Sequence, residues 1–231
     1  PVVYITGQVI KDLTGTDAFQ EADIIGMSMS CVKHSYFVTH ASELQKVIKE
    51  ALYLAKTGRP GPVHVDITKD AWTTQAPYEK NPEMDLPGYT PIPERCSDDE
   101  IKKLENLLNQ PDLKPIIIAG HGIEISNAQK ELLEFAEKHN IPVINTMLGL
   151  GSFPQGHDLW LGMIGMHGDA VANYATADSN LIIAIGTRFS DRIIGRLDTF
   201  IKDKTIVHID IDPSEINKIV KQYADKLESE K

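Results

Sequence analysis

The sequence predicts an α/β protein in which roughly residues 94 to 212 form a doubly wound domain with a parallel sheet, preceded by part of a second α/β domain. Short apolar runs alternate with segments of helical periodicity, and the connections between them are short. One run, Pro115 to Ala119, is apolar throughout, as a parallel strand covered on both faces requires. Glycines or polar residues follow several of the runs directly. This pattern is typical of parallel strands that end at a binding crevice.

The first segment runs to about residue 73 and is expected to have the order strand, loop, helix, strand. Val2 to Ile5 is a β-branched run that predicts a buried strand. Ser42-Glu43-Leu44-Gln45 fits a capping box that opens an amphipathic helix. Gly58 stands where a left-handed residue would end that helix, and Val63 to Ile67 is the next predicted strand.

Residues 74–95 have little periodic apolar character and predict an extended linker between domains. They contain Pro77, Pro82, Pro87, Pro91 and Pro93.

Residues 96–231 repeat strand and helix and form the second predicted domain. Ser97 and Glu100 fit a capping box at the start of a helix, and Ser126 and Gln129 are expected to cap another. A further helix is predicted after Pro213, through Val220. The expected strands are Pro115 to Ala119, Ile141 to Asn145, Leu181 to Ile185 and Thr205 to Ile211.

The composition disfavours several classes of function. A net charge of -10 gives no electrostatic support for nucleic-acid binding. No apolar run reaches the roughly 18 residues of a membrane helix. Cys31 and Cys96 lack the spacing of a disulfide framework or a zinc site, which fits a reducing cytoplasm. The N-terminus has neither a leader peptide nor an initiator methionine, as expected of a processed or excised piece. His34, His64 and His208 have no partner at metal-ligand spacing and are interpreted as structural.

The residues at the predicted strand ends suit a dinucleotide, because ligands bind beyond the carboxyl ends of parallel strands. Glycines permit close approach to a pyrophosphate, arginines neutralise it, and carboxylates accept hydrogen bonds from ribose hydroxyls. The successive ends carry Gly120-His121-Gly122, then Thr146-Met147, then Gly186-Thr187-Arg188 with Asp191 and Arg192, then Asp210-Ile211-Asp212.

Each of these features also has a simpler interpretation. The glycines can be turn residues, the arginines can form surface ion pairs, and Asp212 can cap the following helix. Gly120-His121-Gly122 is not a complete dinucleotide fingerprint, because Ile125 stands at its third glycine position. No acidic residue follows at a strand end about 20 residues on, which disfavours NAD. The glycine- and methionine-rich segment 149–168 is either a flexible connection or a surface along a cofactor.

Eight segments in order resemble the catalytic (large) subunit of acetolactate synthase, also called acetohydroxyacid synthase, a thiamine-diphosphate enzyme. Gly-Thr-Asp-Ala-Phe-Gln-Glu and Gly-Thr-Arg-Phe-Ser-Asp-Arg are the most specific of them. The segments are Ile5 to Val9, Gly15 to Glu21, Val32 to His34, Gly58 to Val63, Asp66 to Asp70, Leu161 to Gly168, Gly186 to Arg192 and Val207 to Asp212.

The resemblance implies the C-terminal part of a pyrimidine-binding domain in residues 1–73 and a Rossmann-like central FAD-binding domain in residues 96–231. It places Gln8, Phe19, Gln20 and Lys69 near the active-site channel and implies no metal ligand in this chain. The implied FAD contacts are Arg59, Gly120, His121, Gly122, Thr146, Met147, Ile164, Gly165, Met166, His167, Gly186, Thr187, Arg188, Asp191, Arg192, Asp210 and Ile211.

The resemblance also implies an activity for the parent enzyme, in branched-chain amino acid biosynthesis in the cytoplasm. The parent decarboxylates pyruvate on thiamine diphosphate with Mg²⁺ and transfers the two-carbon unit to pyruvate or 2-oxobutanoate. FAD is structural in it, because the net reaction is not a redox change. A homodimer or tetramer is implied, and a regulatory subunit is a further implied partner.

The chain departs from the family pattern at two positions and lacks two elements. Ile10 replaces a usual proline, and His121 replaces a usual small residue. The activating glutamate and the metal-binding Gly-Asp-Gly motif are absent, so the chain alone is expected to be inactive. One rival interpretation is a non-catalytic FAD-binding module of the electron-transfer flavoprotein type. A deacetylase of the same central fold is disfavoured, because it needs a zinc-binding cysteine quartet.

Overall fold

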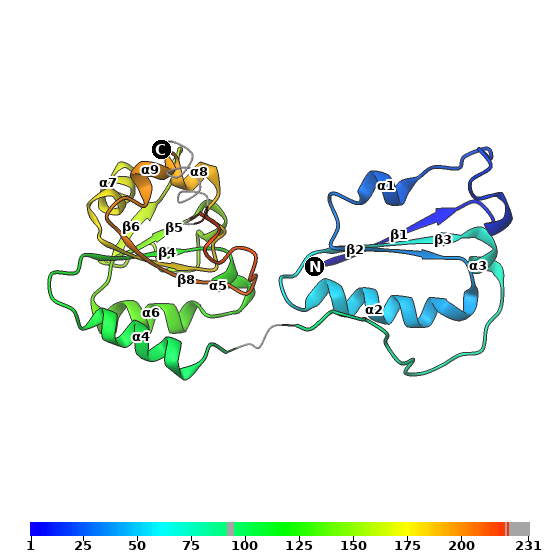
Figure 1. The fold of residues 1–231 in the computed structure, drawn as a ribbon, viewed down its shortest axis with the longest axis horizontal. Helices are drawn as coiled ribbons and strands as arrows, with labels where there is room; N and C mark the ends of the chain where they lie inside the picture. The colour runs from blue at the N-terminus through cyan, green and yellow to red at the C-terminus, as the bar shows by residue number, and fades with distance from the viewer. Residues whose placement is uncertain (92–94, 220, 222–231) are drawn as a thin grey trace. The chain divides into compact units, whose positions relative to one another are not determined.

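The computed structural model describes residues 1–91, 95–219 and 221. The chain forms two compact units, Pro1–Pro93 and Glu94–Lys231 (Figure 1). Each unit has its own parallel sheet and its own core of buried apolar side chains. Within the described ranges, no helix is long and apolar enough to cross a membrane.

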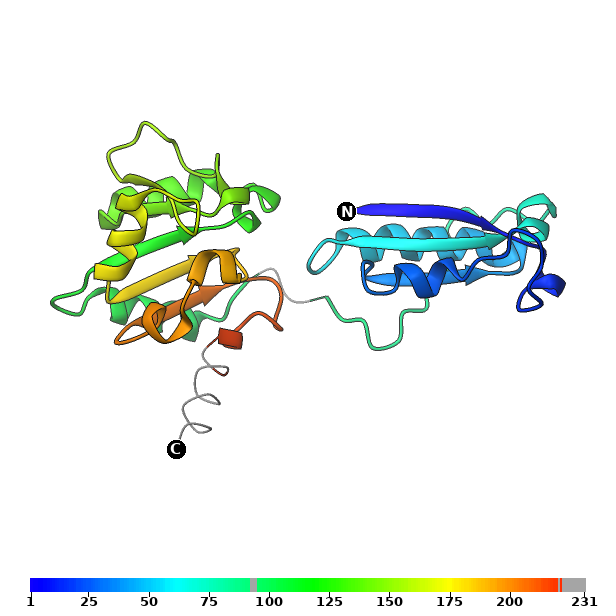
Figure 2. The ribbon, with the colours of Figure 1, turned by 90° about the horizontal axis from the view of Figure 1, so that it is seen from above.

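The first unit contains a three-stranded parallel sheet in the order β1-β3-β2. Figure 2 shows β3 between its two neighbours. The sequence pattern did not predict β2 or the short helix α1. The elements are β1 (Val2–Gln8), η1 (Lys11–Leu13), α1 (Ile24–Ser28), β2 (His34–Val38), η2 (Ala41–Glu43), α2 (Leu44–Lys56), β3 (Pro62–Thr68) and α3 (Lys69–Thr73).

The central strand β3 has two chemically different faces. Val63, Val65 and Ile67 are fully buried and belong to the core that α2 completes with Ala51, Leu54 and Ala55. Because side chains alternate along a strand, His64, Asp66 and Thr68 point to the other face, and they are also buried. In Figure 1 the helices α1 and α2 lie on opposite sides of this sheet.

Two expectations for the first unit were wrong. β1 is an edge strand, and Val2, Tyr4 and Ile5 are exposed rather than buried. The capping box at Ser42 does not form, because a 3-10 turn, η2, precedes α2 and no side chain caps the helix. The Gln45 carboxamide instead donates to Pro77 O at 2.8 Å and accepts from Glu79 N at 2.8 Å.

Those two bonds belong to a larger contact between α2 and residues 74–91. Lys49 Nζ donates to Pro82 O at 2.6 Å, and Glu50 Oε1 accepts from Asp85 N at 2.7 Å. Leu86 and Tyr89 pack on the core of the first unit. The proline-rich segment is therefore held along α2, and the boundary between the units falls after it.

The second unit contains a five-stranded parallel sheet in the order β6-β5-β4-β7-β8. The elements are α4 (Asp98–Leu108), β4 (Pro115–Ala119), α5 (Gly122–Ile125), α6 (Gln129–His139), β5 (Val143–Asn145), η3 (Met147–Gly149), β6 (Trp160–Met163), α7 (Ala170–Asp178), β7 (Leu181–Ile185), α8 (Asp191–Ile194), α9 (Leu197–Phe200) and β8 (Thr205–Ile209).

This strand order confirms the doubly wound α/β class. The chain runs from β4 outward through β5 to β6, and then returns to β7 on the other side of β4. One face of the sheet packs on α4 and α6, and the other packs on α7 and α9 (Figure 1). Ile116 and Ile118 face one core and Ile117 faces the other, which explains why the β4 segment is apolar throughout.

Local expectations in the second unit had mixed outcomes. The capping box is confirmed: Ser97 N donates to Glu100 Oε2 at 3.0 Å, and Glu100 N donates to Ser97 Oγ. Ser126 does not cap α6, because its hydroxyl donates to Gly122 O, the carbonyl of the first residue of α5, and Ala128 precedes α6. Strand β6 and helix α7 were missed. The helix expected after Pro213 reaches Val220, which lies outside the described residues.

Candidate functional site

The site candidate lies where β4 and β7 end side by side. The chain leaves these two central strands in opposite directions across the sheet, which creates the crevice at which open α/β sheets bind ligands. The turns that follow are hydrogen-bonded to each other. Gly120 N donates to Ile185 O at 2.9 Å, and Gly122 N donates to Gly186 O at 3.1 Å.

The glycines of these turns are required by contact between the two backbones. A Cβ atom on Gly120 would lie 2.1 Å from Gly186 O, and one on Gly186 would lie 2.6 Å from Gly122 Cα. The expectation was that these glycines allow a ligand to approach. Because the N–H groups of Gly120 and Gly122 already donate to Ile185 O and Gly186 O, side chains are the groups expected to meet a ligand's charge here.

The end of β5 is organised by Asn145, a residue that sequence reasoning missed. This side chain is fully buried, and its Nδ2 donates to Gly149 O at 2.8 Å. Its Oδ1 accepts from Trp160 Nε1 at 2.7 Å, which joins the loop after β5 to β6. Thr146 is buried and accepts from Gly149 N, whereas Met147 is 62% exposed. The loop therefore presents an apolar thioether at the sheet edge.

The loop after β6 is joined to the segment after β7. Met166 N donates to Arg192 O at 2.9 Å, and a Cβ on Gly165 would lie 2.6 Å from the same oxygen. Asn173 of α7 holds Gly165 by two hydrogen bonds of 3.1 Å each. Asn173 Oδ1 accepts from Gly165 N, and Asn173 Nδ2 donates to Gly165 O. Ile164 points into the core, whereas Met166 and His167 are exposed.

The Phe189 side chain, in the turn after β7, is buried, whereas that of its neighbour Arg188 is exposed. Phe189 has a φ of 52°, which is uncommon for a bulky residue, and its ring packs 4.9 Å from the His208 ring. His208 Nε2 lies 2.8 Å from Thr187 O, as expected of a structural histidine. Thr187 is buried, and the exposed residues of this turn are Arg188, Asp191 and Arg192.

Strand β8 ends at Ile209, earlier than expected, so Asp210 and Ile211 stand in the turn that follows. Asp210 Oδ1 accepts from Asp212 N at 2.9 Å, and its side chain is largely buried. Ile211 is 44% exposed. Asp212 accepts from Ser214 N at 3.0 Å, so the simpler interpretation of Asp212 as a local cap agrees with its contacts.

These turns expose a mixed basic and apolar set of side chains, which we call the carboxyl-end surface. Within it His121 Nδ1 lies 3.5 Å from Glu124 Oε2. No group of His, Cys, Asp and Glu side chains suited to a metal ion occurs in the described part of the chain. The carboxyl-end surface consists of His121, Met147, Met166, His167, Arg188, Asp191, Arg192 and Ile211.

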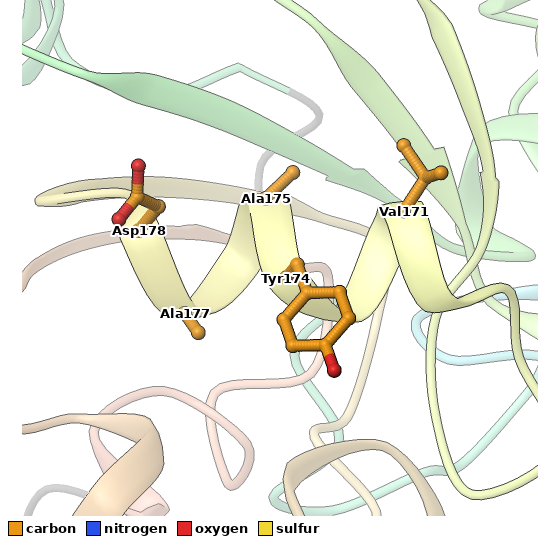
Figure 3. A pocket seen from close by; sticks show the side chains of 5 residues that line it. All are labelled: Val171, Tyr174, Ala175, Ala177 and Asp178. Carbon is orange, nitrogen blue, oxygen red and sulfur yellow. The ribbon is translucent and has the colours of Figure 1, made fainter.

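A hollow along α7 shares no lining residue with the carboxyl-end surface. Figure 3 shows its side chains, which all come from this one helix. It is an open hollow lined by Val171, Tyr174, Ala175, Ala177 and Asp178.

The expected channel residues lie in the first unit. Phe19 is 89% exposed in the loop between β1 and α1, and Gln20 beside it has a φ of 65°. Glu21 closes this loop by accepting from Gly15 N and from Ala18 N. These backbone donors hold the pKa of the Glu21 carboxyl below its usual value.

Three further predicted residues also lie in the first unit. Gln8 is half-buried at the end of β1, and Lys69 is exposed at the start of α3. Arg59, the one predicted FAD contact outside the second unit, is exposed in the turn between α2 and β3.

Comparison with known proteins places this architecture in a family. Residues 101–225 match the family model described as the thiamine pyrophosphate enzyme central domain. The chain belongs to the thiamine pyrophosphate enzymes. The matched residues include β4 to β8 and all of the turns that form the carboxyl-end surface.

The chain is also similar to named acetolactate synthases over nearly all of its length. It is 47% identical over 219 residues to the acetolactate synthase large subunit of Corynebacterium glutamicum, covering 95% of this chain and 35% of that protein. It is 45% identical to the probable acetolactate synthase large subunit of Methanocaldococcus jannaschii, covering 96% and 38%. It is 42% identical to the chloroplastic acetolactate synthase 2 of Nicotiana tabacum, covering 94% and 32%.

These similarities confirm the resemblance that the motifs predicted. The alternative of an electron-transfer flavoprotein module is not supported, since the matching family is that of the thiamine pyrophosphate enzymes. The chain spans about a third of the length of these relatives.

Proposed function

We propose that the carboxyl-end surface of the second unit binds FAD. The observation that carries this proposal is the joining of the turns after β4, β6 and β7 by backbone contacts at one sheet edge. Those contacts hold basic and apolar side chains at the place where doubly wound sheets bind nucleotides. The similarity to acetolactate synthases supports the choice of FAD through the motifs shared with that family.

The exposed residues fit the chemistry of a dinucleotide that carries a large ring. Arg188 and Arg192 would neutralise the pyrophosphate, which the Gly120 and Gly122 N–H groups cannot meet while they donate to backbone carbonyls of this chain. Asp191 and Asp210 offer carboxylate oxygens to ribose hydroxyls. Met147 and Met166 can pack against the flat isoalloxazine ring. FAD when bound would supply that ring, which stabilises the site without changing redox state in the proposed reaction.

We further propose that the whole protein of which this chain is part is an acetolactate synthase. Its reaction would decarboxylate pyruvate and join the two-carbon unit to pyruvate or 2-oxobutanoate, with thiamine diphosphate and Mg²⁺ as cofactors. In that protein the loop with Phe19 and Gln20, together with Lys69, would border the substrate channel. Assembly as a homodimer or tetramer, an associated regulatory subunit and a cytoplasmic location complete the proposal.

The chain alone is expected to make no acetolactate, because it contains no Gly-Asp-Gly metal motif and no counterpart of the activating glutamate. A pyruvate-to-acetolactate assay on the purified 231-residue chain checks this. Sustained turnover above a boiled-protein blank would contradict it.

Titration with FAD, followed by calorimetry and by quenching of flavin fluorescence, tests the binding proposal. We expect saturable binding that weakens about tenfold or more in Arg188→Met, because a charge-assisted contact to phosphate is lost. Arg196→Met is the matched control, because Arg196 is exposed in the same segment but pairs with Asp198 at 2.7 Å. Absence of binding at high micromolar FAD, or equal loss in both variants, would refute the assignment.

A further inference from the structure

The polar face of the first sheet contains a hydrogen-bonded cluster that the proposed function does not use. β1 and β3 pair in parallel, with Thr6 opposite Asp66. Side chains two residues apart share a face of the sheet, so His64 and Gln8 lie on the same side as this pair. His64 is 2% exposed and Asp66 is 1% exposed. Two ionisable groups buried this deeply require specific partners.

The direction of the hydrogen bonds follows from the single proton of each hydroxyl. Thr6 Oγ1 donates to Asp66 Oδ1 at 2.6 Å. The Thr6 oxygen must then accept from His64 Nε2, which lies 2.7 Å away, so this ring nitrogen carries the hydrogen. His64 Nδ1 lies 2.9 Å from Ser28 Oγ of α1, and the single hydrogen of that hydroxyl has a second acceptor in Ile25 O at 3.2 Å. The chain of donors from His64 through Thr6 therefore ends on the Asp66 carboxylate.

The second oxygen of Asp66 contacts Gln8. Gln8 Nε2 donates to Asp66 Oδ2 at 3.3 Å and to Ala22 O at 2.8 Å, and its Oε1 accepts from Val9 N at 2.9 Å. Both hydrogens and the oxygen of this carboxamide are engaged within the protein. Gln8 precedes the loop of residues 9–22, and Ala22 is the last residue of that loop. The carboxamide therefore joins the two ends of the loop.

We propose that Asp66 is a positioning residue. Its Oδ2 orients the Gln8 carboxamide so that this carboxamide bonds both ends of the loop 9–22, an arrangement that we call the clasp. Gln8 then fixes the position of the loop, and its carboxamide does not bind substrate. The clasp determines where Phe19 and Gln20 stand, and the statement that they stand beside a substrate channel rests on the proposed function. Ser28, His64 and Thr6 hold Asp66 in the rotamer that leaves Oδ2 facing Gln8.

The experiment compares the whole chain with three variants: Gln8→Ala, Asp66→Asn and the control Gln75→Ala. Gln75 is an exposed glutamine of the same unit. The first measurement is amide hydrogen exchange at Gly15, Ala18 and Glu21, whose N–H groups are bonded within the loop. We expect exchange about threefold to tenfold faster in Gln8→Ala, as the loss of one net hydrogen bond predicts. Gln75→Ala should exchange like the wild type.

The second measurement is the NMR signature of the Gln8 side-chain amide, which does not report on overall stability. In the wild type its two hydrogens should have separate, slowly exchanging resonances, and ¹⁵N spectra should show hydrogen on His64 Nε2. In Asp66→Asn the Gln8 resonances should move to the positions typical of the exposed Gln75. If Asp66→Asn does not fold, Gln8→Ala still tests whether the carboxamide closes the loop, and the wild-type Gln8 resonances still test whether the carboxamide is held in place.

Three results would overturn the proposal. The first is a wild-type exchange rate in the loop of Gln8→Ala, and the second is a Gln8 amide that already behaves like Gln75 in the wild type. The third is an unchanged set of Gln8 resonances in folded Asp66→Asn. FAD titration reports on the second unit and loop exchange on the first. Failure of the FAD proposal and failure of the clasp are thus separate outcomes.

Discussion

The Lys33 ammonium group donates a hydrogen bond to the Tyr89 hydroxyl, with 3.0 Å between Nζ and Oη. The same Nζ donates to Leu54 O at 2.7 Å and to Thr57 O at 2.6 Å, at the C-terminal end of α2. Carbonyls at this end of a helix have no partner within the helix and attract cations. Lys33 therefore completes α2 and also attaches the segment 74–91 to it through Tyr89.

Replacing Lys33 by methionine should lower the free energy of unfolding of the first unit by about 1 to 3 kcal/mol, because two helix carbonyls lose a charged donor. Denaturant unfolding measures the change. Lys56→Met is the control, since Lys56 is an exposed lysine in the last turn of the same helix. Equal effects of the two substitutions would contradict the assigned role.

The ionisation of Tyr89 should make stability depend on alkaline pH. Burial opposes ionisation, but the hydrogen bonds from Lys33 and Thr57 and the charge of Lys33 outweigh it, so the pKa of Tyr89 is lowered. The folded state then loses its proton before the unfolded state, whose pKa is about 10. This contribution to stability is present above pH about 10 and is lost as pH falls through the lowered pKa.

The measurement is the difference in unfolding free energy between the wild type and Tyr89→Phe. This difference should grow as the pH rises toward about 10. A difference that stays constant or shrinks over this range would refute the coupling to Lys33.

Alanine at position 120 should damage the second unit far more than alanine at an open glycine. The added methyl would lie 2.1 Å from Gly186 O, so the turns after β4 and β7 must separate. We expect a loss of about 1 to 3 kcal/mol or more, as for other forced overpacking. Gly156→Ala is the control, because a Cβ there meets nothing within 4 Å. Thermal unfolding compares the two, and similar midpoints would be inconsistent with the observed packing.

The loop that carries Phe19 should loosen when Glu21 loses its charge. The pKa of Glu21 is lowered by hydrogen bonds from the Gly15 and Ala18 backbone, so its contribution is present above its unfolded pKa and is lost as pH falls through the lowered value. Glu21→Gln should produce the same loosening at neutral pH.

Cleavage by chymotrypsin after Phe19 measures this change. The rate should rise in Glu21→Gln and stay at the wild-type value in Glu83→Gln, a substitution at another exposed glutamate of the first unit. Unchanged cleavage in Glu21→Gln would show that the carboxylate does not order the loop.

The sequence by itself determined the α/β class, the central strands and the family. β3, β4 and β7 are runs of residues buried on one or both faces, and burial of that kind leaves a clear apolar pattern. The Ser97 capping box was also predictable, because both of its bonds join residues three positions apart. The family motifs lie in turns whose glycines and arginines are visible without a structure.

Only the tertiary structure decided which predicted helix caps form and which groups the polar side chains contact. Strands β2 and β6 were missed because each buries only one residue fully, so neither has a clear apolar pattern. Gln45 was expected at a helix cap, but residues 77 and 79 offered its carboxamide better partners. Gln8 matched a channel motif, and its partners Asp66 and Ala22 became known only from the fold. Local pattern reports on neighbours along the chain, whereas the partners of a buried polar side chain come from distant segments.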